Sequence, residues 1–366
     1  MQDKDTTKST FIQLFEPIHN KYFLKYLEDQ EADKYVKKLT TTQLIQLVAL
    51  AQIEQQKSLR DISNSLNEDE LSQALNLDSI SASQISRRLR DLSPAVIQSL
   101  FRAAKLEFGK KVGFNTLRRG LGRISIIDSS TISLCLSQYR WAEFRKTKGA
   151  VKLHLRLRFF DGGVLPDKAV ITPAKPADKT QMDALVVEEE DALNVFDRAY
   201  VDYQKFDHYC ESGIRFVTRL KNNAVTDVVQ EFPVAPGSLI KSDYKVYLGT
   251  AGINKMKNPL RRLEIEDIHG QPVIILTNDF KLSSEQIGNI YRARWQIELF
   301  FKWIKQHFQV KHLYGLSQQA VENQLLIALT TYCLLMMVKL QSNYSGTLLA
   351  IKRLLKTCLY KPFTTF

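Results

Sequence analysis

The stretch RISIIDSSTISLCL, residues 123–136, contains the pattern that most clearly indicates a central strand. It is rich in isoleucine and serine, and its density of β-branched residues is typical of a strand. Asp128 stands where the apolar run gives way. We therefore expect a strand that ends at Asp128 and presents a carboxylate there.

Further strands are predicted on the C-terminal side of this stretch. Polar and apolar residues alternate over residues 152–173 on both sides of Asp161-Gly162-Gly163, which predicts two antiparallel strands joined by a tight turn. ALNVFDRAY, residues 192–200, indicates a short buried strand ending at Asp197, and IRFVTRLK, residues 214–221, indicates another. Helices are expected over about 179–191 and 201–213. This order predicts an α/β fold with a central mixed sheet and flanking helices. Because sites in open α/β sheets lie beyond the strand ends, Asp128 and Asp197 should converge.

The rest of the chain divides into helical and β-rich parts. Residues 40–110 have helical periodicity, and the threonine-rich start at Thr40 suits a helix cap. Residues 221–280 are rich in turns and strands, a long helix is expected over about 283–307, and the apolar run 325–340 is expected to be a buried helix. The predicted domains are an N-terminal helical domain (1–120), two parts of a catalytic core (121–220 and 281–320), a β-rich insertion (221–280) and C-terminal helices (321–366).

Composition indicates an anionic partner. The chain has 366 residues, and 51 Lys and Arg against 39 Asp and Glu give a net charge of +12. Such an excess favours nucleic acid over a membrane. The four cysteines form no C-x-x-C pair, which fits a reducing compartment such as a bacterial cytoplasm, near the nucleoid. The apolar run 325–340 is shorter than the roughly 20 residues that span a bilayer.

A second stretch, YRARWQIELFFKWIK at residues 291–305, places one glutamate among cations. On a helix, Tyr291, Arg294, Glu298 and Lys305 share one narrow stripe, while the apolar residues gather on another. A solvated Arg–Glu pair is the ordinary interpretation of such a face. The alternative is a stripe that faces a metal ion and phosphates.

Asp128, Asp197 and Glu298 together indicate a metal site. Mg²⁺ prefers oxygen ligands and is commonly held by a few carboxylates together with substrate phosphates. Two such ions, Mg²⁺ or Mn²⁺, can activate a nucleophile and stabilise the leaving oxygen in a phosphoryl transfer. Tyr291, Arg294 and Lys305 would then bind nearby phosphates.

The N-terminal half contains a candidate recognition helix. SQISRRLRDL, residues 83–92, places Arg87, Arg88 and Arg90 around a possible apolar side, as in a helix-turn-helix domain that contacts DNA. An ordinary basic surface helix has the same pattern, so both interpretations stay open.

These residues resemble a known family. Tyr291, Arg294, Glu298 and Lys305 match the Y-x2-R-x3-E-x6-K signature of bacterial insertion-sequence transposases of the IS-four group. IIDSST and VFDRAY are similar to the family's first and second aspartate motifs, and the β-rich stretch lies where the family inserts a β domain. The resemblance covers roughly residues 122–315. Ala199 stands where relatives often have Gly, and Ala177 stands where many have His before the Asp.

The resemblance implies an RNase H-like fold with a DDE triad. It implies that Asp128, Asp197 and Glu298 bind the metal ions, and that Tyr291, Arg294 and Lys305 contact phosphates at a DNA end. The protein would cut the ends of an insertion sequence and join the 3′ ends to target DNA, acting as a homodimer on paired terminal repeats. Trp295 would stack on an unpaired base or pack in the core. The alternatives are a metal-dependent nuclease without strand transfer and a non-catalytic DNA-binding descendant.

Overall fold

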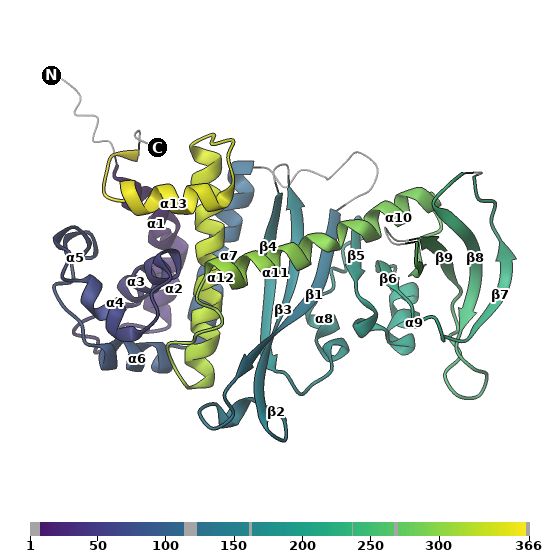
Figure 1. Cartoon of the computed structure of the whole chain (residues 1–366), viewed down its shortest axis with the longest axis horizontal. Coiled ribbons are helices and arrows are strands. Elements are labelled where there is room, and N and C mark those ends of the chain that lie inside the picture. The colour runs from purple at the N-terminus through teal and green to yellow at the C-terminus, as the bar shows by residue number, and fades with distance from the viewer. Residues whose placement is uncertain (1–7, 113–122, 161–162, 236, 267–269, 364–366) are drawn as a thin grey trace. The chain divides into compact units, whose positions relative to one another are not determined.

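The computed structural model describes residues 8–112, 123–160, 163–235, 237–266 and 270–363. The chain forms two compact units: the first contains Met1–Phe114, Ile132–Ala150 and Lys302–Phe366, and the second contains Asn115–Thr131 and Val151–Phe301. Figure 1 shows helices at both ends of the chain and a large sheet in its middle part. The expected fold class, a mixed α/β sheet with flanking helices and a helical N-terminal region, is confirmed.

The first unit is mainly helical. Its longest helix, α12 (Gln318–Gln341), is apolar and long enough to cross a membrane, but 94% of its most apolar window is buried inside the protein. The predicted buried helix is therefore confirmed as a core helix. The other helical elements are α1 (Thr10–Phe15), η1 (Glu16–His19), α2 (Lys21–Asp29), α3 (Thr41–Glu54), α4 (Leu59–Ser65), α5 (Asp69–Leu75), α6 (Ala82–Asp91), α7 (Pro94–Val112), η2 (Arg140–Ala142) and α13 (Leu348–Cys358).

The start of α3 follows the predicted capping pattern. The Thr40 hydroxyl accepts from the Gln43 backbone N–H, and the Gln43 side chain accepts from the Thr40 N–H at 2.8 Å. This reciprocal pair satisfies two backbone donors that have no partner inside a helix. The threonine-rich sequence therefore fixes where α3 begins.

The strands form one mixed sheet. They are β1 (Arg123–Leu134), β2 (Glu143–Arg145), β3 (Lys148–Phe160), β4 (Gly163–Pro173), β5 (Ala192–Phe196), β6 (Arg215–Arg219), β7 (Thr226–Glu231), β8 (Ile240–Leu248), β9 (Leu260–Glu266) and β10 (Pro272–Thr277). The order across the sheet is β2-β3-β1-β5-β6-β10-β9-β8-β7, with β4 paired to β3. β1, β5 and β6 are parallel neighbours, and β3 and β4 form the predicted antiparallel hairpin. Turn residues 161–162 lie outside the described residues.

An aromatic cluster supports the sheet where β5 and β6 lie side by side. The rings of Phe206, on α9 (Tyr203–Glu211), and Phe216, on β6, stack with centroids 4.5 Å apart. Phe196, the last residue of β5, stacks on Phe216 at 5.8 Å, and all three side chains are buried. Burying rings of this size is strongly favourable, so the end of β5 is held firmly.

Three predicted element boundaries are wrong. β1 does not end at Asp128 but continues to Leu134. The helix expected over 179–191 is replaced by a short 3-10 turn, η3 (Asp178–Gln181), and one helical turn, α8 (Met182–Leu185). The long helix expected over 283–307 is two helices, α10 (Ser284–Ala293) and α11 (Trp295–His307).

The β-rich stretch continues the central sheet. β10 pairs with β6 in antiparallel register, β9 pairs with β10, and β8 and β7 follow. β8 and β9 are joined by a buried ion pair in which Arg261 donates to Asp243 at 2.6 Å. The strands after β6 therefore form the far edge of the same sheet.

Candidate active site

The sheet register brings two aspartates to the same level. Ile127 of β1 lies opposite Phe196 of the parallel strand β5, and the next residue in each case is an aspartate. Asp128 lies within β1, and Asp197 directly follows β5. Equivalent residues of neighbouring strands project to the same side of a sheet, so the two carboxylates lie side by side.

The electrostatics of Asp128 place all three predicted acids in one neighbourhood. The pKa of Asp128 is raised to about 6, mainly by burial and also by the charges of Asp197 and Glu298. The Ser129 backbone N–H, which donates to Asp128 at 2.7 Å, and the charge of Arg294 act in the opposite direction. Carboxylates that raise one another's pKa repel each other when both are ionised, and a cation bound between them reduces this repulsion.

Arg294 connects the aspartate of β1 to the glutamate of α11. Its Nη1 donates to Asp128 at 3.3 Å, and its Nη2 donates to Glu298 at 2.6 Å. The side chains of Arg294 and Asp128 are 16% and 18% exposed, whereas that of Glu298 is 36% exposed. The arginine thus forms a bridge between two acids at a site that solvent can reach.

The junction between α10 and α11 sets the position of this arginine. The Arg294 N–H donates to the Tyr291 carbonyl, and the Ile297 N–H donates to the Arg294 carbonyl, both at 3.1 Å. These are three-residue rather than four-residue spacings, so the helix tightens locally where the predicted continuous helix would run. A turn of this kind inside a helix is common at functional sites.

Tyr291 is packed beside the same group. It is 9% exposed, and its ring centroid lies 5.7 Å from the guanidinium of Arg294. Burial raises the pKa of Tyr291 to about 12, the Arg294 charge opposes this shift and the Asp197 charge adds to it. The hydroxyl therefore stays protonated at neutral pH and can donate a hydrogen bond to an anion.

A second layer, centred on Asp178, supports the first aspartate. The Ser129 hydroxyl donates to Asp178 at 2.8 Å, and Lys152 of β3 forms an ion pair with it at 3.0 Å. His154, two residues further along β3, lies 3.6 Å from the same carboxylate and is bonded to Thr172 at 3.1 Å. Sequence reasoning did not assign a role to Asp178. Lys152 and His154 alternate on one face of a strand, and this pattern is the sequence signal that could have indicated an acidic partner such as Asp178.

Unsatisfied polar atoms gather around these acids. The Nε atoms of Arg294 and Arg219 and the Nδ1 of His154 are buried without a hydrogen-bond partner in the described structure. Such atoms are uncommon in proteins. Arg219 is the last residue of β6, one position after Thr218, which pairs with Phe196. It therefore lies level with Asp197, and only the tertiary register could reveal this.

The chemical type of the residues at this site suits a divalent cation. Three carboxylates supply the oxygen donors that Mg²⁺ and Mn²⁺ prefer. Among the described residues, the carboxylate of Asp197 makes no capping hydrogen bond to the 3-10 turn that follows it, η4 (Arg198–Tyr200). In this arrangement no three His, Cys, Asp or Glu side chains among the described residues are close enough to hold one ion. The guanidinium of Arg294 instead lies between Asp128 and Glu298.

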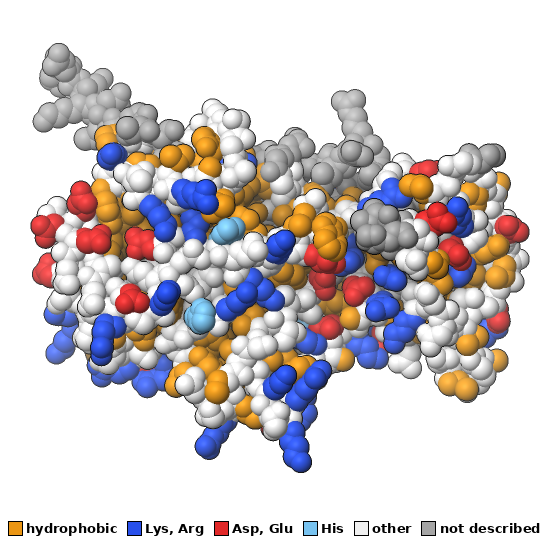
Figure 2. All heavy atoms as spheres, viewed as in Figure 1, with side chains coloured by type: hydrophobic (Ala, Val, Ile, Leu, Met, Phe, Trp, Pro, Cys, Tyr) orange, Lys and Arg blue, Asp and Glu red, His pale blue; other side chains and the backbone are white. Residues whose placement is uncertain are grey.

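Figure 2 shows acidic side chains exposed together on one face of the molecule, with Lys and Arg side chains nearby.

Trp295, the first residue of α11, is 57% exposed, so the interpretation of a core-packed aromatic is wrong. Lys305 lies on the last turns of α11, within the first compact unit.

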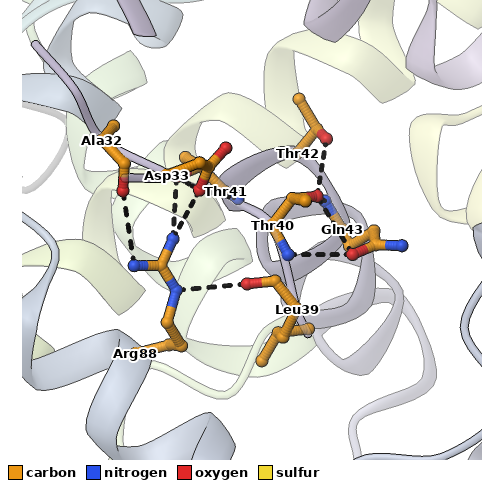
Figure 3. Close-up of polar contacts among 8 residues, drawn as sticks. All are labelled: Ala32, Asp33, Leu39, Thr40, Thr41, Thr42, Gln43 and Arg88. Carbon is orange, nitrogen blue, oxygen red and sulfur yellow. Dashed lines mark hydrogen bonds and ion pairs between the residues drawn. The ribbon is translucent and has the colours of Figure 1, made fainter. Parts of the chain in front are cut away.

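The three N-terminal arginines differ from one another. Arg88 is a structural crosslink: it donates to the carbonyls of Leu39 and Ala32 and to the side chains of Asp33 and Thr41 (Figure 3). By contrast, the two neighbouring arginines of α6, Arg87 and Arg90, are exposed, and Arg90 pairs with Asp91 at 2.7 Å. The contacts of Arg88 use most of its donors inside the protein.

Fold and site together define an α/β protein with two aspartates at the same level of neighbouring strands and a helix-borne glutamate that shares an arginine with the first aspartate. Residues 119–334 match the family model of the transposase DDE domain, and residues 6–74 match a domain of unknown function (DUF4372). The chain therefore belongs to the DDE transposase family and is a DNA transposase, an enzyme that cleaves and transfers DNA strands. Members of the family generally use divalent metal ions.

Bacterial insertion-sequence proteins are among the relatives. The chain is 32% identical to a protein named transposase y4zB of Sinorhizobium fredii, over 67% of this chain and 69% of the relative. It is 29% identical to a transposase named for insertion sequence element IS5377 of Geobacillus stearothermophilus, over 63% and 61%. It is 24% identical to one named for element IS4SA of Synechocystis, over 74% and 75%. The cryo-EM structure of the piggyBac transposase synaptic complex with hairpin DNA matches 97% of this chain and 80% of that chain, with a TM-score of 0.44 at 11% identity.

Proposed function

We propose that Asp128, Asp197 and Glu298 are the catalytic acids and hold two Mg²⁺ or Mn²⁺ ions during DNA cleavage and strand joining. The observation that supports this most directly is the register of β1 and β5, which sets Asp128 and Asp197 side by side. The link from Asp128 through Arg294 to Glu298 adds the third acid.

In this proposal the ions supply a nucleophile activated at neutral pH and stabilise charge on the leaving oxygen. The chain's own residues position the DNA. Arg294 would exchange its carboxylate partners for a backbone phosphate, because a guanidinium binds phosphate with the same forked geometry. Tyr291 would donate a hydrogen bond to a neighbouring phosphate oxygen, and the exposed Trp295 would stack on an unpaired base.

The helical N-terminal region, residues 1–120, would bind the terminal inverted repeats. Arg87 and Arg90 are its exposed candidates on α6, whereas we assign Arg88 to the stability of the unit because its donors are already used. The protein would act as a homodimer on paired DNA ends, in the bacterial cytoplasm at the nucleoid. The net charge of +12 supports an extended contact with DNA.

The decisive experiment is Glu298→Gln assayed for cleavage at the 3′ end of a duplex carrying the element's terminal repeat. We expect binding of the duplex to be retained, while cleavage with Mn²⁺ falls at least about a thousandfold, since the amide cannot serve as an anionic ligand. EDTA should have the same effect on the unaltered protein.

The matched control is Glu285→Gln, which removes an exposed carboxylate at the start of α10, the helix preceding α11. This variant should cleave normally. Cleavage by Glu298→Gln at the control rate would remove Glu298 from the chemistry. Cleaved ends that are never joined to target DNA would instead indicate a nuclease.

A further inference from the structure

The first compact unit contains a cavity of about 300 Å³ with a basic lining. Lys57, Lys305, Lys311 and His312 supply its charged or chargeable side chains, and no Asp or Glu is among the described residues that line it. Lys57 comes from the connection between α3 and α4, and Lys311 and His312 follow α11. We call this group the lysine pocket.

Buried glutamines join the two segments that form the lysine pocket. The Gln309 N–H donates to the Gln52 side chain at 2.7 Å, and the Gln309 amide donates to the Gln55 carbonyl at 2.8 Å. In the other direction, the Gln55 amide donates to the Gln306 carbonyl at 2.9 Å. Segments about 250 residues apart in the sequence are therefore fixed against each other by directional bonds.

The core helix α12 anchors the same loop from behind. Gln324, which is fully buried, donates to the carbonyls of Gln309 and His312 at 2.5 and 3.0 Å and accepts from the Tyr314 N–H at 2.7 Å. The Tyr314 hydroxyl donates to the Gln56 carbonyl at 2.8 Å. Buried hydrogen bonds of this kind restrict the movement of the groups that they join. The basic side chains are therefore presented on a preformed frame.

No Asp or Glu is among the described residues that line the lysine pocket, and its cations lie close to one another. Burial lowers the pKa of Lys305, and the neighbouring charge of Lys311 lowers it further. Of the two acids nearest to Lys57 in the sequence, Glu54 accepts from the Gln56 side chain at 2.6 Å, and Asp61 accepts from the backbone N–H groups of Lys57 and Ser58 at 3.2 and 2.9 Å. Within the part of the chain that the structure describes, the ammonium groups of Lys57 and Lys311 make no ion pair. Cations held together in this way favour an anion between them.

We propose that the lysine pocket binds backbone phosphates of duplex DNA, so that the α3–α4 connection and the segment after α11 grip the same DNA. The inference rests on the proposed function, because Lys305 is already expected to contact a DNA-end phosphate. What it adds is the contribution of Lys57, Lys311 and His312. These three side chains are exposed, so a large polyanion can reach them.

The test is the salt dependence of DNA binding by the full-length protein in EDTA, which separates binding from cleavage. We would compare the unaltered chain with Lys57→Gln/Lys311→Gln on a labelled duplex of arbitrary sequence, using fluorescence anisotropy. Each phosphate neutralised contributes about 0.9 to the slope of log K against log salt. We expect that slope to fall by about one to two, and the affinity at roughly 150 mM salt to fall about tenfold.

The matched control is Lys241→Gln/Lys255→Gln, which removes the same charge from lysines already paired with Glu266 and Asp227 at 3.2 and 2.5 Å. Its slope should be unchanged. Lys57→Arg/Lys311→Arg, which keeps the charge, should restore binding and excludes misfolding as the cause of the loss. Equal slopes for the Gln variant and the unaltered chain would overturn the proposal.

A second arm separates DNA from a small anion. In this arm, inorganic pyrophosphate is tested for thermal stabilisation of the unaltered chain and of the Gln variant. If pyrophosphate stabilises only the unaltered chain, while the salt dependence of DNA binding is the same for both proteins, the pocket is a free-phosphate site and the proposal is overturned. Because neither arm requires strand cleavage, an inactive catalytic site would leave the result intact. Conversely, the Gln variant could cleave DNA normally and show the same salt dependence of DNA binding as the unaltered chain. That result would overturn the lysine pocket and leave the proposed catalytic function standing.

Discussion

Two arginines of the second unit show the difference between a closed ion pair and an open one. Arg261 of β9 donates to both carboxylate oxygens of Asp243 at 2.6–3.2 Å and to the Leu282 carbonyl at 2.6 Å. The two charged side chains are 10% and 1% exposed. Arg294 instead divides its contacts between two acids and leaves its buried Nε without a partner in the described structure.

The difference separates stability from function. In the closed pair each of the three guanidinium nitrogens has a partner, so breaking the pair costs free energy. An open pair in a site that solvent reaches can exchange its partner for a ligand that satisfies it better. The buried Nε of Arg219, which lies level with Asp197, also has no partner in the described structure, and no such atom belongs to the Arg261 pair. We therefore expect substitutions at the two places to affect different measurements.

The largest effect on folding should come from Asp243→Ala. The change leaves the buried guanidinium of Arg261 without its counter-ion, and breaking one partner of a buried pair typically costs about 3–5 kcal/mol. Urea unfolding at neutral pH measures the loss. Asp227→Ala, which removes an acid from the exposed pair with Lys255, is the matched control and should change stability by less than about 1 kcal/mol. Equal losses in the two variants would contradict the distinction.

A smaller, pH-dependent effect is expected for His154→Gln. Burial lowers the pKa of His154 to about 4; the charge of Asp178 opposes this and that of Lys152 adds to it. In the unfolded chain the pKa is about 6.5, so between these values the unfolded chain binds more protons. The stability associated with neutral His154 is therefore present above pH 6.5 and is lost as the pH falls towards 4, by about 3 kcal/mol in total.

The glutamine variant does not titrate and can still bond to Thr172. The difference in unfolding free energy between the two proteins should therefore shift in favour of the variant as the pH falls from about 7 to about 4.5. Urea unfolding across that range measures it. Parallel curves for the two proteins would mean that His154 is not held neutral in the fold.

The sequence predicts which acids lie close together better than it predicts the elements that carry them. The second half of β1 was missed because it is buried on one side only. Ile132 is buried there, while Thr131 and Ser133 are exposed. A partly exposed strand is polar, so the Ser-Ser-Thr run was interpreted as the strand's end. The strand ending at Asp197 was placed correctly because all five residues of β5 are buried and apolar apart from one asparagine.

That asparagine explains another wrong prediction. Asn194 accepts from the Val187 N–H and donates to the Val187 carbonyl, both at 2.9 Å, so the chain around Val187 is bonded to β5 instead of continuing a helix. The placements of Arg219 and Asp178 beside the acids likewise depend on tertiary register, which no local pattern contains. The assignment of the catalytic acids themselves stays a prediction until variants are assayed.

The smallest expected effect concerns Arg294→Gln and tests the open pair directly. The guanidinium lies between Asp128 and Glu298, where it competes with any cation for the same carboxylates. Without DNA, the variant should bind Mn²⁺ about fivefold more tightly, which corresponds to about 1 kcal/mol, in calorimetric titration. Arg292→Gln, two residues earlier and exposed, removes the same charge and should leave the affinity unchanged. Weaker binding by Arg294→Gln would mean that the arginine holds the acids in place for the metal. In that case its contacts would be as structural as those of Arg261, and the distinction between the two arginines would fail.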